Sequence, residues 1–450
     1  MTATTAPGPV DPRAWLDDHV NLESLGVPPG MSRRATHPTL ERMEALASLL
    51  GSPQLDQPFI HLTGTNGKTS VARLATALLV EHGLSVGAYT SPNLERVNER
   101  ITWNLVEIHD DVLDTLLLLT AELEPHLPAP PSYFEILTGV ALRFFADVAV
   151  DLGVVEVGLG GTWDATNVID GRVAVVTNVT VDHVEYLGPT RADIASEKAG
   201  IVKPGATLVL GEPDPELVPL FEEHDPGELW LRGRDFGVTE NRLAHGGRYI
   251  GLATPAARYP ELVLSLHGAH QADNAAIALA AAEAFLGRPL EADLVADVFG
   301  RARSPGRLEV VANHPLVLLD GAHNVAGAHA LAAALAEEFP PAPRTLVVGL
   351  LREKDPGEML GALGVEQYAH IVCCRPPSAR ALDPARVADA ALAAGVDPGR
   401  VTVIAPVAEA VAHAQALAGE AGQVVVTGSL YVVGAARSAF RGADDRTGAE

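Results

Sequence analysis

The stretch of sequence that decides the fold reads His61-Leu62-Thr63-Gly64-Thr65-Asn66-Gly67-Lys68-Thr69-Ser70. It follows a short apolar run, Gln57 to Leu62, that predicts a buried strand. It precedes Val71 to Glu81, whose apolar residues recur at helical spacing. The glycines therefore lie at a strand-to-helix turn, which is the setting of a phosphate-binding loop, or P-loop.

The residue types in this turn suit a bound triphosphate. Gly64 and Gly67 allow the backbone to approach an anion closely, and Lys68 adds a full charge to the positive end of the following helix. One position departs from the usual pattern, because Leu62 stands where the first glycine of a P-loop would fall. A glycine-rich turn that binds no phosphate is the alternative, but Lys68 and Thr69 follow the second glycine in the required order. We expect the nucleotide phosphates to contact Gly64, Thr65, Asn66, Gly67, Lys68, Thr69 and Ser70.

Composition narrows the class of protein. The chain has 450 residues, is 47% hydrophobic and carries a formal net charge of −25. This length suits two domains with ample cores. The negative charge argues against a general surface for nucleic acid or an anionic membrane, so a phosphate must meet a local cluster of positive groups. No signal sequence and no uninterrupted apolar stretch of membrane-spanning length is present, so we expect a cytoplasmic protein. The first residues are rich in Thr, Ala and Pro and are expected to be a disordered leader, and we expect the protein to be a monomer.

Lysine is scarce, and its positions are therefore candidates for chemistry that needs an amine. It occurs only at Lys68, Lys198, Lys203 and Lys354, while arginine supplies nearly all the other positive charge. An arginine cannot replace a lysine where the side chain must form a carbamate or a Schiff base. Lys198 lies where a helix is expected to end, and a solvated helix residue is the alternative interpretation.

Three strands of the first domain end in polar residues that suit magnesium. The apolar runs are Ser85 to Thr90, Leu152 to Val157 and Val173 to Asn178. Ser91, Glu156 and His183 lie at their C-terminal ends, which meet at one edge of a parallel sheet. Phosphate together with one or two carboxylates is a common magnesium site, and a carboxylate in an apolar strand is costly without a partner. The alternatives are a turn serine, an ordinary ion pair and a structural histidine.

The other segments of the first domain offer fewer functional signals. Residues 41–50 predict an amphipathic helix, and no site residue is expected before the P-loop strand. Ser132 and Glu135 have capping-box spacing at the start of a further helix. Residues 211–260 are rich in turn signals, and together with a short strand at 262–264 they predict an irregular flank to the sheet.

A break in periodicity separates two domains. A helix is expected from Ala275 to Phe285, with Asn274 in its first turn. Turn residues then follow at Phe299-Gly300 and at Ser304-Pro305-Gly306-Arg307. We therefore expect one domain at residues 1–303 and a second at 304–450.

The second domain predicts another parallel sheet with covering helices. Its expected strands are Leu316 to Leu319, Thr345 to Gly349, His370 to Cys374, Val401 to Ile404 and Gln423 to Thr427. Asp320, His323, Lys354 and Ser429 follow three of these strands and face one edge. We expect His323 to act in catalysis and Lys354 and Ser429 to bind substrate. Cys373 and Cys374 are neighbours in a strand, point to opposite faces and are expected to be inert core residues.

A series of motifs in a fixed order identifies a resemblance. They are G-T-N-G-K-T-S, T-S-P-N-L, S-Y-F-E, E-V-G-L-G-G-T-W-D-A-T-N, D-H, E-K-A-G-I, H-Q-A-D-N-A, P-G-R-L-E, L-D-G-A-H-N and G-S-L-Y-V-V-G. From about Glu41 to Arg437 the chain resembles the folylpolyglutamate synthase family of the Mur ligase superfamily, whose bacterial members often also act as dihydrofolate synthases. The fold implied is an α/β P-loop domain with a mostly parallel sheet, followed by a smaller Rossmann-like α/β domain.

The resemblance implies a reaction and a set of site residues. ATP phosphorylates the carboxylate of dihydropteroate or a folate such as tetrahydrofolate, L-glutamate attacks the acyl phosphate, and ADP and phosphate leave. By the resemblance, Asn274, Arg307 and Asp320 contact ATP, and Lys198 is carbamylated. Two Mg²⁺ ions are implied, with ligands at Thr69, Ser91, Glu156 and His183. G-K-T-S replaces the G-K-G-S of many relatives, so either Thr69 or Ser70 could meet the metal. The pterin contacts implied are Ser132, Tyr133, Phe134, Glu135, Trp163, Asp164 and Ala165.

Two other classes of protein share parts of this pattern. A cell-wall Mur ligase has the P-loop but is expected to carry a further N-terminal domain, for which the segment before Lys68 is short. A non-catalytic nucleotide-binding protein would not need Glu156 or the motifs of the second domain. An acyl phosphate must be kept from water, so we expect the two domains to close about the segment from Ser304 to Arg307.

Overall fold

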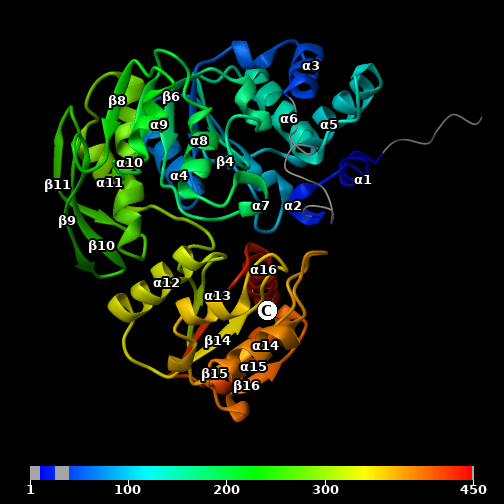
Figure 1. The fold of residues 1–450 in the computed structure, drawn as a ribbon, viewed down its shortest axis with the longest axis vertical. Helices are drawn as coiled ribbons and strands as arrows, with labels where there is room; N and C mark the ends of the chain where they lie inside the picture. The colour runs from blue at the N-terminus through cyan, green and yellow to red at the C-terminus, as the bar shows by residue number, and fades with distance from the viewer. Residues whose placement is uncertain (1–10, 26–39, 448–450) are drawn as a thin grey trace, which may run out of the picture.

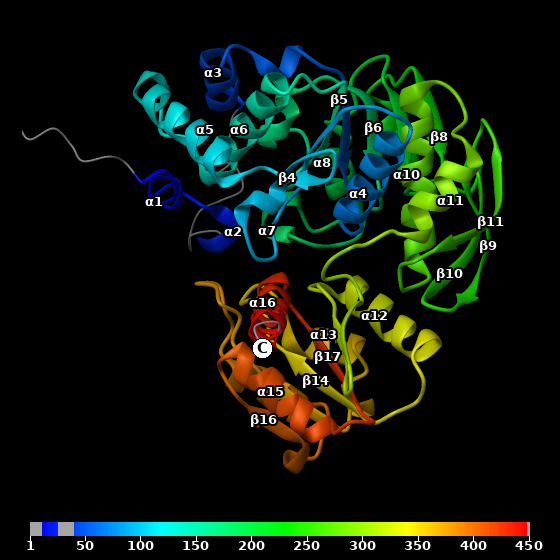
Figure 2. The same cartoon turned by 180° about the vertical axis from the view of Figure 1, so that it is seen from behind.

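The computed structural model describes residues 11–25 and 40–447 (Figure 1). The disordered leader expected from the sequence falls mainly on residues 1–10, which lie outside the described residues. Figures 1 and 2 show two α/β domains, one above the other, and the chain passes once from the first to the second. In the described part of the chain, no helix is both long enough and apolar enough to span a bilayer.

The first domain is built on an eight-stranded sheet with the order β4-β3-β2-β5-β1-β6-β7-β8. The six strands from β2 to β8 in this order run parallel, and the β3–β4 hairpin adds an antiparallel edge. The strands are β1 (Phe59–Thr63), β2 (Val86–Tyr89), β3 (Ile101–Trp103), β4 (Val106–Glu107), β5 (Leu152–Glu156), β6 (Gly171–Val176), β7 (Thr207–Leu210) and β8 (Glu228–Leu231). The predicted mostly parallel α/β domain is confirmed.

Helices cover both faces of this sheet because its central strands are apolar on both sides. Ile60 and Leu62 pack into one core, whereas Phe59 of the same strand packs into another. This alternation follows from the two-residue period of a strand. The helices are α1 (Pro12–Asp17), α2 (Leu22–Leu25), α3 (Glu41–Leu49), α4 (Lys68–Glu81), α5 (Asp110–Leu123), α6 (Tyr133–Asp147), α7 (Val184–Leu187), α8 (Arg191–Ala199), α9 (Val218–Glu222), α10 (His270–Leu286) and α11 (Ala292–Gly300).

Two expectations for this domain are wrong. Residues 211–260 are not an irregular flank, because β8 extends the main sheet and β9 (Gly237–Ala244), β10 (Gly247–Ala253) and β11 (Arg258–Leu264) form a separate three-stranded antiparallel sheet. Most residues of β9 are polar and exposed, so apolar and polar residues do not alternate along it. The sequence therefore gave no signal that this segment is a strand paired in a sheet. In addition, α10 starts at His270 rather than Ala275, which places Asn274 in its second turn.

The second domain has a six-stranded sheet with the order β12-β13-β17-β14-β15-β16. Its strands are β12 (Glu309–Asn313), β13 (Leu316–Leu319), β14 (Arg344–Val348), β15 (His370–Cys373), β16 (Val401–Val403) and β17 (Gln423–Thr427). Its helices are α12 (Val325–Glu338), α13 (Pro356–Ala362), α14 (Pro384–Ala393), α15 (Val407–Ala418) and α16 (Leu430–Thr447). The five predicted strands are present and parallel, and β12 is an additional antiparallel edge strand. Cys373 and Cys374 are buried in cores on opposite sides of the sheet, as predicted.

Candidate active site

The P-loop connects β1 to α4 and is held by the end of β6 and by α10. Thr65 donates its backbone N–H to the carbonyl of Asn178 at 3.0 Å, and Asn66 donates to that residue's Oδ1 at 3.0 Å. Gly67 has φ +84°, and a Cβ there would lie 2.5 Å from Oδ1 of Asn274. A glycine is therefore required both by the backbone conformation and by the close approach of α10.

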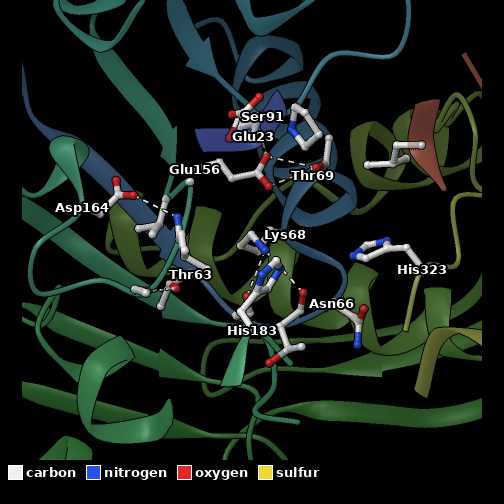
Figure 3. A pocket seen from close by; sticks show the side chains of 18 of the residues that line it. Glu23, Thr63, Asn66, Lys68, Thr69, Ser91, Glu156, Asp164, His183 and His323 are labelled. Carbon is white, nitrogen blue, oxygen red and sulfur yellow. Dashed lines mark hydrogen bonds between the residues drawn. The ribbon is translucent and has the colours of Figure 1, made fainter. Parts of the chain in front are cut away.

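Lys68 is the first residue of α4, and its side chain is labelled in Figure 3. Its Nζ donates to the carbonyls of Gly64 at 3.0 Å and Thr65 at 3.4 Å. Burial lowers the pKa of Lys68 below its usual value, and the charge of Glu156 opposes that effect. The amine thus donates to two carbonyls, and the carboxylates of Glu156, Asp182 and Asp164 act on it. An entering phosphate would gain a full counter-charge from this amine.

Glu156 ends β5 and is almost completely buried. Both of its carboxylate oxygens accept from Oγ1 of Thr69, at 3.1 and 3.0 Å, and Oε2 also accepts from the backbone N–H of Ser91 at 3.3 Å. Burial raises the pKa of Glu156 to about 7, although Lys68 lowers it in part. Three predicted metal ligands are thus brought together: the carboxylate of Glu156, the hydroxyl of Thr69 in the first turn of α4, and Ser91, which makes its contact through the backbone N–H.

His183 lies apart from this group. Figure 3 shows Lys68 between Glu156 and His183. Burial lowers the pKa of His183 to about 3, so its imidazole is neutral. Within residues 11–25 and 40–447, no group of three or more His, Cys, Asp or Glu side chains is arranged to hold a metal ion. Any metal here would need oxygen ligands from a bound phosphate as well as from the protein.

Lys198 is the second buried lysine of the site. It lies in the last turn of α8 and is only 3% exposed. Burial, and then the charge of Lys68, lower the pKa of Lys198 to about 7. A substantial fraction of its amine is therefore neutral near neutral pH, which is the form that reacts with carbon dioxide.

These groups open on one cavity of about 1340 Å³ between the two domains. With one exception, every site residue predicted from the sequence lines it. They are Gly64, Thr65, Asn66, Gly67, Lys68, Thr69, Ser70, Ser91, Ser132, Phe134, Glu135, Glu156, Trp163, Asp164, Ala165, His183, Lys198, Asn274, Arg307, Asp320, His323, Lys354 and Ser429. The exception is Tyr133, which is buried in the core beneath α6, with the guanidinium of Arg100 5.5 Å from its ring centroid.

Ser132 and Glu135 have a structural role at the start of α6 that does not depend on a ligand. Glu135 donates its N–H to Oγ of Ser132 at 3.2 Å, and Ser132 donates its N–H to Oε2 of Glu135 at 2.7 Å. The predicted capping box is thus present. Asp164, which also lines the cavity, is buried and accepts from the backbone N–H groups of Leu159 at 2.9 Å and Thr166 at 3.0 Å.

One wall of the cavity was missed by the sequence analysis. Residues 18–23 line it, together with Leu40, Arg42 and Met43. Glu23 anchors this segment: its carboxylate accepts from Arg100 of the first domain at 3.0 and 2.6 Å, and its carbonyl accepts from Arg380 and Tyr431 of the second, each at 2.9 Å. No periodicity or motif marks these residues, so only their contacts reveal them.

The second domain contributes a carboxylate and an imidazole. Asp320 accepts from the backbone N–H groups of Leu308 and Ala322, each at 2.9 Å. Burial raises the pKa of Asp320, and Arg307 opposes that effect. His323 donates from Nδ1 to the carbonyl of Gly321 at 2.8 Å. Burial lowers the pKa of His323 to about 4, so Nε2 carries no proton and is available as an acceptor.

Polar contacts join the two domains beside the P-loop. Nζ of Lys354 pairs with Oδ1 of Asp182, and Asn324 donates to Oδ2 of Asp182 at 2.9 Å. Although burial opposes ionisation, the charge and hydrogen bond of Lys354 hold the pKa of Asp182 well below its usual range. The sequence analysis missed Asp182 and Asn324. Both lie in motifs, D-H and G-A-H-N, in which the histidine was the residue expected to act.

Comparison with known protein families shows the family to which this chain belongs. Residues 62–282 match the Mur ligase middle domain, and residues 306–430 match the Mur ligase glutamate ligase domain. The dihydrofolate synthase/folylpolyglutamate synthase of Mycobacterium tuberculosis is 39% identical over 443 residues, with 90% of each chain covered. The folylpolyglutamate synthase of Lacticaseibacillus casei is 33% identical, with 92% of this chain and 96% of that one covered. The chain therefore belongs to the dihydrofolate synthase/folylpolyglutamate synthase family of Mur ligases.

Solved structures agree in fold. The Mycobacterium tuberculosis folylpolyglutamate synthase complexed with ADP has a TM-score of 0.85 and 37% identity, covering 95% of this chain and 97% of that one. Escherichia coli FolC in complex with DHPP and ADP has a TM-score of 0.82 and 28% identity, covering 98% and 100%.

Proposed function

We propose that this protein is an ATP-dependent ligase that joins L-glutamate to the carboxylate of dihydropteroate or of a folate such as tetrahydrofolate. The carboxylate oxygen attacks the γ-phosphorus of ATP, and ADP leaves. The amine of L-glutamate then attacks the acyl carbon, loses a proton, and displaces phosphate. The observation that carries the proposal is that one cavity is lined by the P-loop, by the buried carboxylate of Glu156 and by residues that follow strands of the second domain.

Nucleotide binding is assigned to residues on both sides of the domain interface. Residues 64–70 hold the phosphates, with Lys68 offsetting the repulsion between triphosphate and carboxylate. Asn274, Arg307 and Asp320 line the same cavity and are assigned to the rest of ATP. The close packing of Asn274 on Gly67 supports this, because it brings α10 to the phosphate loop.

Magnesium is assigned to Glu156, Thr69 and Ser91, and we assign a second ion near His183. The fit is supported by the donor set, since the hydroxyl of Thr69 and the carboxylate of Glu156 suit Mg²⁺ and Ser91 lies beside them through its backbone N–H. A small number of protein ligands leaves room for phosphate oxygens. Bound Mg²⁺ supplies positive charge against the phosphates. Thr69, rather than Ser70, is proposed as the hydroxyl ligand, because Oγ1 of Thr69 contacts Glu156 whereas Oγ of Ser70 lies 3.1 Å from Oγ of Ser304.

Lys198 is proposed to carry a carbamate. Its amine has a pKa of about 7 and is buried in the cavity, where the charge of Lys68 and the carboxylates of Asp182, Glu197 and Asp164 act on it. A carbamate replaces an ammonium group with an anionic oxygen donor, which would help to hold a second magnesium ion. Lysine at this position, in a chain with only three others, supports the proposal.

The two substrates are assigned to different groups of cavity residues. The pterin lies against residues 132, 134, 135 and 163–165 of the first domain. Tyr133 does not line the cavity and packs in the core that supports these residues. Lys354 and Ser429 bind L-glutamate, which requires Lys354 to exchange its bond to Asp182 for one to a substrate carboxylate. His323 presents its unprotonated Nε2 as an acceptor for the glutamate ammonium group.

The proposal extends to domain organisation. We divide the chain at residues 303 and 304, and closure about Ser304 to Arg307 would exclude water from the acyl phosphate. The separate sheets on either side of this segment support the division. The molecule is proposed to act as a cytoplasmic monomer with small-molecule partners, and its net charge of −25 disfavours nucleic acid and anionic membranes.

The test is release of ADP in the presence of Mg²⁺, ATP and L-glutamate with either dihydropteroate or tetrahydrofolate. The proposal requires ADP release to depend on the pterin substrate and on glutamate, with a product heavier by one glutamate residue. Activity with a UDP-linked cell-wall precursor instead would favour the cell-wall alternative. Nucleotide binding without turnover would favour a non-catalytic protein.

A further inference from the structure

We propose that Glu338 is a positioning residue for the nucleotide, because it clamps α12 of the second domain to the segment that starts α10 in the first. The proposal rests on the nucleotide site assigned above. The proposed clamp includes strands of the three-stranded sheet β9–β11, which is separate from the eight-stranded sheet of the first domain. Figures 1 and 2 show this small sheet beside α12.

Glu338 is the last residue of α12 and is surrounded by donors from the other domain. Its side chain is only 3% exposed. Oε1 accepts from Nη1 of Arg248 at 3.0 Å and from the backbone N–H of Gly268 at 2.8 Å, and Oε2 lies 3.0 Å from Nδ1 of His267. Although burial opposes ionisation, these donors hold the pKa of Glu338 below its usual value.

Arg248 on β10 is buried as deeply as its partner. Its side chain is 2% exposed, and Nε donates to Oδ1 of Asn241 on β9 at 2.8 Å. Asn241 in turn donates to the carbonyl of Ala269 at 3.0 Å, which directly precedes α10. A continuous set of hydrogen bonds therefore runs from the end of α12 through β10 and β9 to the start of α10.

Both clamped helices form walls of the cavity. His270, Gln271 and Asn274 line it from the start of α10, and residues 326, 327, 330 and 331 line it from α12. Asn274 also packs on Gly67 of the P-loop. An α-helix transmits a displacement of one end to the other, and α12 is about 21 Å long at 1.5 Å per residue. The bonds of Glu338 therefore set the separation of the two walls between which the nucleotide is assigned.

Glu337 provides a matched control. It is the neighbouring residue, has the same charge and also accepts from Arg248, at 2.8 Å, but its side chain is 44% exposed. A single bond to an exposed carboxylate contributes little. In Glu338→Gln, by contrast, one acceptor oxygen is replaced by an NH₂ donor, so at least one of the three buried donors loses its partner.

The experiment compares Glu338→Gln and Glu337→Gln by calorimetric titration with ADP and by amide hydrogen exchange. We expect the Kd for ADP to rise about tenfold in Glu338→Gln and to stay within about twofold of the wild type in Glu337→Gln. KM for the pterin substrate should stay within about twofold in both variants, because its assigned walls belong to the first domain alone. A purely structural role would instead lower the active fraction and leave the Kd and each KM unchanged.

Hydrogen exchange tests the clamp without nucleotide. Glu338→Gln should accelerate exchange at the end of α12 and at residues 266–270, and Arg248→Met should add little in the Glu338→Gln background because it acts on the same bonds. Unchanged exchange, or ADP binding within about twofold of the wild type, overturns the proposal. Failure of the wild type to bind ADP would refute the proposed nucleotide site, and exchange would still decide whether Glu338 clamps the helices.

Discussion

Asn324 of the second domain donates a hydrogen bond to Oδ1 of Asn66 in the P-loop at 3.0 Å. The same amide group donates to Asp182, and Oδ1 of Asn324 accepts the backbone N–H of Gly327, which caps α12. One side chain thus starts a helix and joins the two domains at the phosphate loop. Its contacts can be separated by mutation.

Asn324→Ala should lower kcat/KM about tenfold and destabilise the protein by about 1 kcal/mol, because it removes the interdomain bonds and the helix cap together. Asn324→Ser restores the cap but cannot reach Asn66, so stability should return while activity stays low. Asn313→Ala, at an exposed position of β12, is the control. Thermal unfolding measures the loss of stability, and steady-state rates measure the loss of kcat/KM. Recovery of full activity in the serine variant would show that only the cap is important.

Lys68→Ala should reduce turnover with both pterin substrates by at least about 100-fold while leaving the fold intact, because the amine supplies charge to phosphate. ADP release and circular dichroism measure the two effects. Lys203→Ala is a matched control, since its Nζ donates to the carbonyl of Asn167 and it does not line the cavity. Rates near those of the wild type in Lys68→Ala would contradict the P-loop assignment.

Glu156→Gln should raise the Mg²⁺ concentration for half-maximal rate by about tenfold or more, because it removes the carboxylate charge from the assigned ligand set. The measurement is the rate as a function of Mg²⁺ at saturating ATP. Glu212→Gln removes another buried carboxylate, one that pairs with Arg191 outside the cavity, and should leave the Mg²⁺ dependence unchanged. Equal Mg²⁺ dependence in Glu156→Gln and the wild type would refute the assignment.

Lys198→Arg should inactivate the enzyme although the positive charge is kept, because only an amine can form a carbamate. Lys203→Arg is expected to be active. In bicarbonate-depleted buffer the wild type should lose activity and regain it when bicarbonate is added. The sign of the pH effect follows from the pKa of about 7: the neutral amine, and with it carbamate formation, increases as pH rises through that value. A carbon-13 carbamate signal that is absent from Lys198→Arg would identify the site, and a fully active Lys198→Arg variant would exclude a required carbamate.

Cys373 and Cys374 should not react with a thiol reagent in the native protein. Both are buried, and burial raises the pKa of each thiol to about 12. Near pH 8 the thiolate fraction is about one in ten thousand, and access requires unfolding. Two thiols should be titrated in denaturant. Rapid labelling of the native protein would show that β15 is not a core strand.

The sequence alone determined the fold class, the central strands and most of the polar groups assigned to the site. The physical reason is that strands apolar on both faces and the glycine-rich turn at residues 64–67 are local signals, and parallel strands bring their C-terminal ends to one edge. Ser91, Glu156 and Asp320 could therefore be placed near the P-loop from their positions after apolar runs.

Only the tertiary structure decided how the two domains meet and what closes the cavity. Asp182, Asn324, Glu23 and Glu338 are polar residues whose importance comes from partners more than 60 residues away in sequence, and no local pattern encodes such a partner. The same holds for Tyr133, which shares a motif with Ser132 but lies on the inner side of α6. Periodicity assigns a residue to a face of its own element, whereas packing of one element on another determines which residues contact the ligand.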